Sequence, residues 1–367
     1  MKIFIAGGGT AGHINPALTI ADLLVSDLAV KKGDITFIGT KRGFEKDLVP
    51  RAGYAIEFIT VRGFRRKISF NTIQGILSLM LGMIQARHLI KKEKPDLVIG
   101  TGGYVSGPVL YYASRFKIPT LIHEQNALPG VTSKILAKRV DACAISFEES
   151  RKYFTECKKV VLTGNPLRDD ILSSDRKQCR QNLGIKDNEK LVVVMGGSLG
   201  ALAINNAMTD LINNEFKDHD FRLIFAPGKK YYEDVKGKIF NNYDGIEIKD
   251  YIYNAPEVYH AADLIIARGG AMTISEMMAI GIPSILIPSA NVAENHQENN
   301  ARAIEKAGAC KVILDKDLNG KVLYDIMMTL LLDETKLSDM RSNAYEIGIR
   351  DAKKRIADML REMIKVS

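Results

Sequence analysis

The sequence predicts an α/β protein built from two doubly wound, Rossmann-like halves. Short apolar runs recur along the chain, several of them break into glycine-rich loops followed by helical patterns, and the second half repeats the design of the first. Two such halves that face one another leave a cleft between the carboxyl ends of their sheets. Folds of this class hold their ligands at those ends.

The chain opens on an apolar run, residues 2–6, that is typical of a buried parallel strand. It breaks into Gly-Gly-Gly-Thr-Ala-Gly at residues 7–12, and a helical pattern starts at Ile14. Unpaired N–H groups and the helix dipole at such a junction bind anions, usually phosphate. The glycine spacing also matches a dinucleotide fingerprint, but the acidic residue expected about 20 residues further on is missing. A glycine turn that merely packs a helix onto a sheet is the alternative interpretation.

His13 directly follows this loop, at the N-terminus of the predicted helix. The helix dipole disfavours an imidazolium there, so a neutral imidazole able to accept a proton is expected. His13 is therefore a candidate general base.

Composition limits the classes of function. A chain of 367 residues has room for two domains, and its net charge of +8 suits an anionic partner such as nucleotide phosphate, lipid pyrophosphate or an acidic membrane surface. No Lys/Arg run with interleaved aromatics appears and there is no Trp, which argues against nucleic acid. The four cysteines lack CxxC pairing, and no apolar run reaches ~20 residues. With no signal-peptide pattern, we expect a cytosolic protein.

Residues 62–92 carry a basic cluster followed by a helical pattern with an unusually wide apolar arc. We expect one apolar stripe to face the core and a second to lie well round from it. The basic residues are Arg62, Arg65, Arg66 and Lys67, the core stripe is Phe70, Ile73, Leu77, Met80 and Ile84, and the second stripe is Ile76, Leu79 and Met83. Either the helix is sandwiched between two packed elements, or the second stripe is exposed and docks on an anionic bilayer.

Two more strand ends in the first half carry ligand-binding signals. The run 95–100 opens into a second glycine loop, Thr101-Gly102-Gly103-Tyr104, and the strand 118–122 ends in His123-Glu124-Gln125-Asn126. Polar side chains at the carboxyl end of a parallel strand are where an open sheet keeps its ligand contacts. A polar loop that caps the next helix is the alternative.

The pattern of an apolar strand, a glycine loop and a helix then starts again in the second half of the chain. Residues 164–168 (Gly-Asn-Pro-Leu-Arg) suit a domain boundary, and the strand 190–195 breaks into a third glycine loop at 196–200. Asp96-Leu97 precedes Gly102-Gly103 by the same interval as Asp263-Leu264 precedes Gly269-Gly270. Each glycine pair leads through a helix to a strand that begins Ile-Pro.

The helix after Gly270 carries Glu276 about two turns in. A carboxylate is the usual grip on a ribose diol, because it accepts two hydrogen bonds. A solvated helix residue is the alternative. The stretch from about Tyr345 to Val366 predicts a charged amphipathic helix without chemistry of its own.

Taken together, the ordered motifs GGGTAGHINPAL, TGGYVSGP, HEQNALPG, GNPLR, GGSLGA and RGGAMTISE resemble those of the peptidoglycan N-acetylglucosaminyltransferase family. The resemblance runs over nearly the whole chain. Members of that family transfer N-acetylglucosamine from UDP-N-acetylglucosamine to undecaprenyl-pyrophosphoryl-N-acetylmuramyl-pentapeptide (lipid I), forming lipid II.

The resemblance implies an inverting glycosyltransferase of the B type that acts on the 4-hydroxyl of the N-acetylmuramoyl group, with no cofactor and no metal. Residues 1–164, completed by the C-terminal helix 346–367, would hold the lipid acceptor and face the membrane. Residues 165–345 would hold UDP-N-acetylglucosamine. The enzyme would sit peripherally on the anionic inner leaflet, at the cytoplasmic face of the cell membrane.

The resemblance also assigns site residues. Ile252 would contact uracil through its backbone, Gln297 and Asn126 would contact sugar hydroxyls, and Ser198 and Arg168 would face the diphosphate. The full donor set is Thr10, Ala11, Gly12, Asn126, Arg168, Ser198, Ile252, Ala271, Met272, Thr273, Glu276 and Gln297. The acceptor pyrophosphate would contact Gly8, Gly9, Gly102, Gly103 and Tyr104. The catalytic candidates are His13 and, after it, Glu124. The expected membrane patch consists of Ile76, Leu79, Met83, Arg65, Arg66 and Lys67. Two departures are mild: Ala11 stands where the family often has Gly, and His296-Gln297 where some members have a Gln pair.

Glycine-loop N–H groups, a helix N-terminus and Arg168 can stabilise the leaving UDP without metal. Asp315-Lys316-Asp317 has the letter pattern of a metal-binding Asp-x-Asp but lies far from both glycine loops, and we interpret it as a loop and helix cap.

Three alternatives remain at the sequence level. One is another UDP-sugar enzyme of this fold, either a glycolipid glycosyltransferase or a UDP-N-acetylglucosamine 2-epimerase. Another is a non-catalytic nucleotide-binding or membrane-scaffold protein, against which His13 and the donor motifs argue. An NAD-dependent dehydrogenase is disfavoured, because the second half repeats the first instead of adding a distinct catalytic domain.

Overall fold

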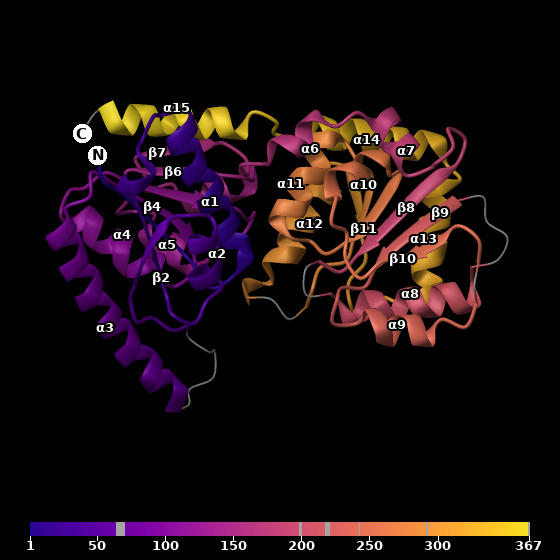
Figure 1. Ribbon diagram of the computed structural model, residues 1–367, viewed down its shortest axis with the longest axis horizontal. Coiled ribbons are helices and arrows are strands. Elements are labelled where there is room, and N and C mark those ends of the chain that lie inside the picture. Colours follow the sequence, from indigo (N-terminus) through magenta and orange to yellow (C-terminus); the bar gives the residue numbers. More distant parts are fainter. Residues whose placement is uncertain (64–69, 198–199, 217–220, 242, 291–292, 366–367) are drawn as a thin grey trace. The chain divides into compact units, whose positions relative to one another are not determined.

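The computed structural model describes residues 1–63, 70–197, 200–216, 221–241, 243–290 and 293–365 (Figure 1). The chain divides into two compact units. Unit 1 comprises Met1–Leu167 and Asp351–Ser367, and unit 2 comprises Arg168–Arg350. The divisions therefore fall a few residues beyond 164 and 345, where the sequence placed them.

Unit 1 contains, within its described residues, a seven-stranded sheet in the order β3-β2-β1-β4-β5-β6-β7. All of its neighbouring strands are parallel, and Ile3 of β1 pairs with Ile35 of β2 on one side and Leu97 of β4 on the other. The strands are β1 (Ile3–Gly7), β2 (Ile35–Gly39), β3 (Ala55–Phe58), β4 (Leu97–Gly102), β5 (Thr120–Glu124), β6 (Ala142–Ile145) and β7 (Lys159–Leu162). The strand order reverses between β1 and β4, which is the switch point where open α/β sheets bind ligands.

Alternate residues of β1 face opposite sides of this sheet, as the pleat requires. Ile3 and Ile5 join a core with α1 and α15, whereas Phe4 and Ala6 join a core with α3 and α4. The helices of unit 1 are α1 (Ala11–Ser26), α2 (Glu45–Arg51), α3 (Phe70–Glu93), α4 (Ser106–Arg115), α5 (Val131–Leu136) and α15 (Ala352–Lys365), with short 3-10 turns at Lys32–Asp34 and Glu148–Tyr153. The sheet is thus covered on both faces, which explains its continuous apolar strands.

The C-terminal helix α15 returns to unit 1 after the chain has built unit 2. Ile356 and Leu360 are fully buried against the α1 side of the sheet, and Arg355 donates to the carbonyl of Leu162 at 2.9 Å. The single helix expected from 345 to 366 is wrong at its start. Tyr345 belongs to the end of α14. That helix ends before Gly348, where a Cβ would lie 2.2 Å from the carbonyl oxygen of Met278.

Helix α3 presents a different face to the core from the one expected. Leu77, Met80 and Ile84 are exposed by 60%, 59% and 64%, so the expected core stripe is wrong for these residues. The buried positions of the described helix are instead Gly75, Gly82, Ala86 and Ile90. The physical reason is close backbone packing, because a Cβ on Gly82 would lie 2.7 Å from the carbonyl oxygen of Thr60.

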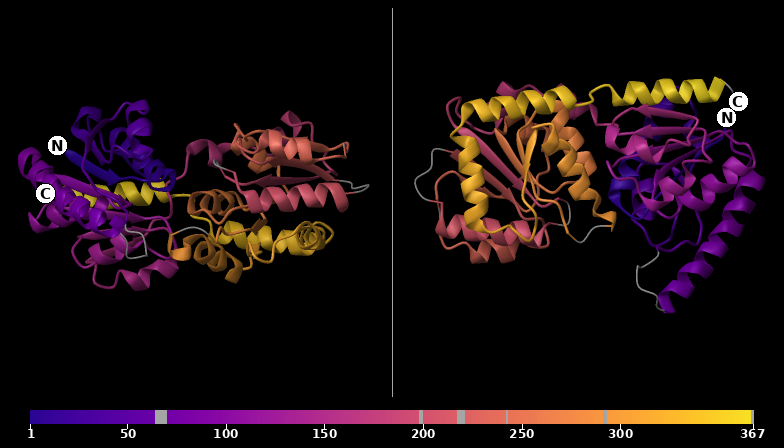
Figure 2. Two further views of the ribbon diagram at one scale, coloured as in Figure 1. Left: turned by 90° about the horizontal axis from the view of Figure 1, so that it is seen from below. Right: turned by 180° about the vertical axis from the view of Figure 1, so that it is seen from behind.

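The expected second stripe of α3 is only partly outside. Ile76 is 49% exposed, whereas Leu79 and Met83 are half-buried. The exposed apolar face therefore consists of Ile76, Leu77, Met80, Leu81 and Ile84, which we call the α3 patch. Figures 1 and 2 show the N-terminal part of α3 projecting beyond the rest of unit 1. The side chains of Phe70 and Ile73 lie outside the described residues.

Unit 2 repeats the topology of unit 1 in its described residues, with a six-stranded parallel sheet in the order β10-β9-β8-β11-β12-β13. The strands are β8 (Lys190–Met195), β9 (Phe221–Ala226), β10 (Ile246–Ile248), β11 (Leu264–Ala267), β12 (Ser284–Leu286) and β13 (Cys310–Val312). The helices are α6 (Asp169–Ser173), α7 (Arg176–Asn182), α8 (Leu202–Asn214), α9 (Tyr232–Lys238), α10 (Ala255–Ala261), α11 (Ala271–Ile280), α12 (His296–Lys306), α13 (Gly320–Leu331) and α14 (Glu334–Ile347), with a 3-10 turn at Ala293–Asn295. Its switch point lies between β8 and β11.

Across the described part of the chain, no helix combines the length and the apolar character that a bilayer crossing requires.

Candidate active site

The two glycine loops of unit 1 meet at the carboxyl ends of β1 and β4. A Cβ on Gly103 would lie 2.4 Å from the carbonyl oxygen of Gly8, and a Cβ on Gly102 would lie 2.8 Å from Cδ2 of His13. Gly102 and Gly103 also have positive φ angles of 104° and 79°. Both positions therefore need glycine, for space and for backbone conformation. The structure brings together Gly8, Gly102, Gly103 and His13 at these strand ends.

The ring of His13 is held by the first loop. Its Nδ1 lies 3.1 Å from the carbonyl oxygen of Gly8 and 3.4 Å from Oγ1 of Thr10. Its backbone carbonyl accepts from the hydroxyl of Thr101 at 2.9 Å. A carbonyl oxygen can only accept, so the contact with Gly8 places the ring proton on Nδ1. In the neutral ring the other nitrogen, Nε2, then carries a lone pair on the side of Gly102.

Helix α1 begins beside this ring without a side-chain cap. Thr10 occupies the N-cap position in an extended conformation, and its side chain makes no capping hydrogen bond. Thr10 and Gly12 are exposed. The first-turn amides of Ala11 and Gly12 therefore point toward a place that an anion can occupy.

The N–H group of Gly9, by contrast, already has a partner inside the protein. It donates to Oε2 of Glu45 at 2.9 Å. Gly9 thus supports the first loop in this structure, and its amide is not open to a phosphate oxygen.

The polar segment at the end of β5 is buried. His123 is fully buried, its Nε2 donates to the carbonyl of Gly164 at 3.2 Å, and its Nδ1 accepts from Gln125 at 3.0 Å. Burial lowers the pKa of His123 to about 4, so its ring is neutral near pH 7. Glu124 is 3% exposed, and its Oε1 accepts from the backbone N–H and the side-chain amide of Asn126, each at 3.1 Å. No hydrogen bond between described residues joins Glu124 to His13.

Tyr104, half exposed at 49%, continues the second loop toward the basic segment. A Cβ on Gly63 would lie 2.4 Å from its ring, so the tyrosine packs closely against that glycine. Arg62, the neighbour of Gly63, donates to Gln74 of α3 at 3.0 Å. Arg65, Arg66 and Lys67 lie outside the described residues, as does Ser198 of the third glycine loop.

In unit 2 the corresponding corner lies at the carboxyl ends of β8, β11 and β12. A Cβ on Gly269 would lie 2.5 Å from the carbonyl oxygen of Gln297, so the start of α12 lies close against the pair Gly269-Gly270. The side chain of Gln297 accepts from the backbone N–H of Ser289 at 2.9 Å. Helix α11 starts at Ala271 after Gly270 with no side-chain cap, so the amides of Ala271, Met272 and Thr273 form an anion-binding N-terminus.

Glu276 lies on α11 among largely buried surroundings. Desolvation raises its pKa to about 7, although Arg168 counteracts the shift. Arg168 is the first residue of unit 2, and its guanidinium pairs with Asp170. Ile252, which follows β10, is 7% exposed. A carboxylate that lacks full hydration is well suited to accept hydrogen bonds from a diol, because the diol supplies the donors that water does not.

The remaining expected donor contacts, Thr10, Ala11, Gly12 and Asn126, belong to unit 1. The expected donor set is therefore divided between the two units.

The Asp-x-Asp pattern at 315–317 lies in the loop before α13, as expected, but it does not cap that helix, so the second part of the interpretation is wrong. Asp315 accepts from Arg268 at 2.5 Å and from the backbone N–H of Ala290 at 3.2 Å, which holds the ends of β11 and β12 together. Asn319 caps α13 instead, accepting from Val322 N at 2.9 Å. Among the described residues no group of three or more His, Cys, Asp and Glu side chains is placed to hold a metal ion.

Two residues of these corners were not singled out from the sequence. Glu45 contacts Gly9 across 36 positions of sequence, and Arg268 pairs with Asp315 across 47. A single sequence carries no signal for contacts at such separation. The glycines at positions 39 and 43, which flank Glu45, are the only local hint.

Two family models match the chain. The glycosyltransferase family 28 N-terminal domain matches residues 3–145, and the glycosyltransferase family 28 C-terminal domain matches residues 191–357. These matches correspond to the body of unit 1 and to most of unit 2 followed by part of α15.

Curated relatives match over the full length. The UDP-N-acetylglucosamine--N-acetylmuramyl-(pentapeptide) pyrophosphoryl-undecaprenol N-acetylglucosamine transferase of Acetivibrio thermocellus is 50% identical over 366 residues, covering 100% of this chain and 99% of its own. The enzyme of the same name from Ruminiclostridium cellulolyticum is 49% identical, covering 99% of this chain and 100% of its own. The crystal structure of Acinetobacter baumannii MurG superposes with a TM-score of 0.82 at 26% identity, covering 98% of this chain and 99% of that one.

The two Rossmann-like halves and the resemblance read from the motifs are thereby confirmed. The chain belongs to the family of UDP-N-acetylglucosamine--N-acetylmuramyl-(pentapeptide) pyrophosphoryl-undecaprenol N-acetylglucosamine transferases, built from the two domains of glycosyltransferase family 28.

Proposed function

We propose that this chain transfers N-acetylglucosamine from UDP-N-acetylglucosamine to the 4-hydroxyl of the N-acetylmuramoyl group of lipid I, giving lipid II for peptidoglycan synthesis. The observation that carries this proposal is 50% identity, over the whole chain, to an enzyme named for this transfer. The two glycine-lined corners at switch points support it, because the reaction needs one diphosphate site for the donor and one for the acceptor.

Unit 2 holds the donor in this proposal. The diphosphate of UDP lies at the N-terminus of α11 and near Arg168, where amide dipoles and a guanidinium stabilise the charge that develops as UDP leaves. Glu276 accepts from the ribose hydroxyls, the backbone of Ile252 contacts uracil, and Gln297 contacts a sugar hydroxyl. Ser198 would face the diphosphate.

Unit 1 holds the acceptor. The pyrophosphate of lipid I lies against Gly8, Gly102, Gly103 and Tyr104, within reach of the uncapped N-terminus of α1. Gly9 shapes this loop from within, because its amide is taken by Glu45. Thr10, Ala11, Gly12 and Asn126 contact the donor from unit 1.

Inversion requires the acceptor hydroxyl to attack the anomeric carbon from the face opposite UDP. The C–O bond to the phosphate breaks, the new glycosidic bond forms, and the hydroxyl proton passes to a base. We assign this base to His13, whose Nε2 is free of the proton held at Nδ1. Glu124 is the second candidate, and its burial against Asn126 favours a supporting role.

The α3 patch docks unit 1 on the anionic inner leaflet of the cell membrane, peripherally and from the cytoplasmic side. Its exposed apolar side chains would enter the interface, and the basic residues Arg62, Arg65, Arg66 and Lys67 would contact lipid headgroups.

The transfer is tested by incubating the protein with radiolabelled UDP-N-acetylglucosamine and a lipid I analogue. A radiolabelled lipid-linked disaccharide is the expected product. If the label is epimerised or hydrolysed without acceptor-dependent transfer, the protein is another UDP-sugar enzyme of the same fold.

The base is tested by measuring kcat and the acceptor KM separately for His13→Ala and Glu124→Gln. Loss of a base costs on the order of a hundred- to ten-thousand-fold in rate, whereas loss of a positioning contact raises mainly the acceptor KM. A kcat within a few-fold of the parent in His13→Ala would leave His13 a binding role only.

A further inference from the structure

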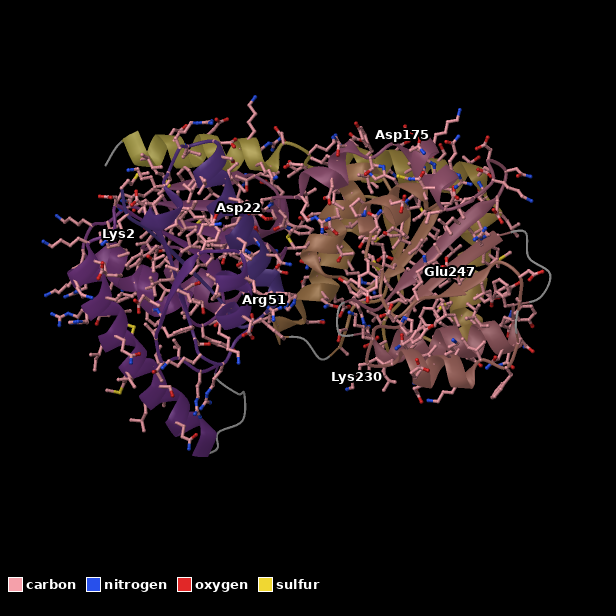
Figure 3. The ribbon with its side chains drawn as sticks, viewed as in Figure 1. Lys2, Asp22, Arg51, Asp175, Lys230 and Glu247 are labelled. Carbon is pink, nitrogen blue, oxygen red and sulfur yellow. The ribbon has the colours of Figure 1, made fainter. Side chains whose placement is uncertain are left out.

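A buried carboxylate lies beneath the first glycine loop. Glu45 is the first residue of α2, whose last residue, Arg51, is labelled in Figure 3, and its side chain is 0% exposed. Its Oε2 accepts from the N–H of Gly9 at 2.9 Å, and its Oε1 accepts from the N–H and the hydroxyl of Thr40 at 2.9 and 2.8 Å. Within the described ranges no Lys, Arg or His side chain pairs with it. A buried carboxylate without a cation depends entirely on such neutral donors.

Three glycines make room for this carboxylate. A Cβ on Gly8 would lie 2.6 Å from Oε1 of Glu45, one on Gly43 would lie 1.9 Å from Oε2, and one on Gly39 would lie 2.6 Å from Cγ. These glycines come from the ends of β1 and β2 and from the loop before α2. Any side chain at the three positions would displace the carboxylate, so the local sequence accommodates a glutamate here.

A single peptide unit connects Glu45 to His13. The N–H of Gly9 and the carbonyl of Gly8 belong to the same peptide, so one side of it donates to Glu45 while the other accepts from Nδ1 of His13 at 3.1 Å. Hydrogen bonds arranged in such a chain strengthen one another. Because this peptide joins two glycines and Gly9 has a φ of 88°, its rotation is restrained little by side chains.

We propose that Glu45 is a positioning residue for His13, acting through the Gly8–Gly9 peptide. The carboxylate fixes the peptide with its carbonyl toward His13, the carbonyl holds the ring proton on Nδ1, and Nε2 stays unprotonated on the side of the acceptor loops. The carboxylate of a hydrolase triad orients its histidine by direct contact, whereas here one peptide stands between the two groups. This inference rests on the proposed function in that it takes His13 as the base.

Glu45→Gln separates this role from simple space-filling. Glutamine keeps the size of the side chain but offers one acceptor oxygen, while donors approach both oxygens of the carboxylate. An amide that still accepts from Thr40 therefore turns its NH₂ group toward the N–H of Gly9, and the peptide loses its anchor. We expect kcat to fall about ten- to a hundredfold through misplacement of the ring. Affinity for UDP, held by unit 2, should not change. A lower acceptor KM with an unchanged kcat would overturn the proposal, because the carboxylate would then act only as a charge that repels pyrophosphate.

Thr40→Val is the matched control. It removes the hydroxyl donor to the same carboxylate but leaves the contact with Gly9 in place. Both variants should lower the melting temperature, and only Glu45→Gln should lower kcat by more than about twofold. An equal loss of kcat in both variants would make Glu45 a structural residue.

The tautomer of His13 gives a readout that does not depend on turnover. In protein labelled with ¹⁵N-histidine, under alkaline conditions that keep imidazole neutral, the ring resonances distinguish Nδ1–H from Nε2–H. His13→Gln identifies the His13 signals among the six histidines. We expect Nδ1–H in the wild type and a mixture in Glu45→Gln. Nε2–H in the wild type would overturn the proposal. If the tautomers behave as expected while His13→Ala keeps its kcat, the assignment of the base fails and the positioning of the ring by Glu45 stands.

Discussion

At the scale of single residues, Glu276 shows how burial tunes a ligand-binding carboxylate. Desolvation raises its pKa from 4.5 to about 7, so a substantial share of this group is protonated in the free protein near neutral pH. A protonated carboxyl accepts hydrogen bonds poorly, and its capacity to hold a ribose diol should therefore depend on pH.

We expect Glu276→Ala to raise the Kd for UDP-N-acetylglucosamine about ten- to a hundredfold, because a charge-assisted pair of hydrogen bonds is lost. In the wild type the affinity should weaken as the pH falls through about 7. Isothermal titration calorimetry at several pH values from about 5.5 to about 8.5, which span the shifted pKa, checks both effects. Glu276→Gln is the control and should show a flatter profile. An unchanged Kd in the alanine variant would remove Glu276 from the donor site.

The same shift has a consequence for stability, with a definite sign. Between pH 4.5 and about 7 the folded state binds more protons at Glu276 than the unfolded state does. The free energy of unfolding contributed by this group therefore falls as the pH rises through that window. Glu276→Gln removes the penalty, so its melting temperature should gain more over the wild type at pH 8 than at pH 5. A gain of equal size at both values would contradict the shifted pKa.

At the scale of elements, α3 explains which parts of the fold can be read from sequence. The strands and glycine loops were predictable because apolar runs such as Ile3–Gly7 and glycine pairs such as Gly102-Gly103 are local signals. The faces of α3 were not. The helix packs through Gly75, Gly82 and Ala86, small residues that count little in an apolar pattern, so the larger side chains were assigned inward.

The residues of the candidate site also fall into those with a local sequence signal and those without one. The glycines and His13 stand at strand ends or helix starts, which turn residues mark in a sequence, and Glu276 follows such a start by about two turns. Glu45 has no such signal, because its role arises from a tertiary contact with Gly9. The end of α14 before Gly348, where no Cβ fits against Met278, could not be predicted from the sequence for the same reason.

Membrane docking through the α3 patch is tested with a triple variant, Leu77→Ser, Met80→Ser and Ile84→Ser. Each side chain is more than half exposed, so removing it should leave the fold intact and weaken binding to anionic liposomes. At about 1 kcal/mol for each partly inserted side chain, the partition coefficient should fall roughly a hundredfold. Sedimentation with liposomes and a melting curve give the two readouts. A variant that melts early while its folded fraction still binds liposomes would place these residues in the core after all.

Packing of α3 on the segment that follows β3 is tested by Gly82→Ala. The added methyl would meet the carbonyl oxygen of Thr60 at 2.7 Å, so the helix must move. We expect a loss of about 1–3 kcal/mol in the free energy of unfolding, as is usual for overpacking. Urea denaturation measures it. Ser78→Ala, at a half-buried position of the same helix, is the control and should not destabilise the protein. If Gly82→Ala is as stable as that control, the close approach of the two backbones is not part of the fold.

At the scale of the whole molecule, the repeat of one topology in both units supports chemistry that needs two diphosphate sites. Amide dipoles at helix starts would serve both sites without a metal ion, and Arg168 would add a guanidinium at the donor site. Treatment with EDTA should therefore leave kcat within about twofold at saturating substrates. A strict requirement for Mg²⁺ or Mn²⁺ under those conditions would show that the leaving UDP is stabilised in another way.

The return of α15 to unit 1 also orders the events of biosynthesis. Strands β1–β7 leave the ribosome before unit 2, yet the α1 face of their sheet lacks Ile356 and Leu360 until all of unit 2 has been made. The apolar strip that α15 will cover is therefore open to solvent, or to a chaperone, throughout translation of residues 168–350. Unit 2, whose residues are contiguous, can complete its fold first, and the half of the protein that is made first is the half that is finished last.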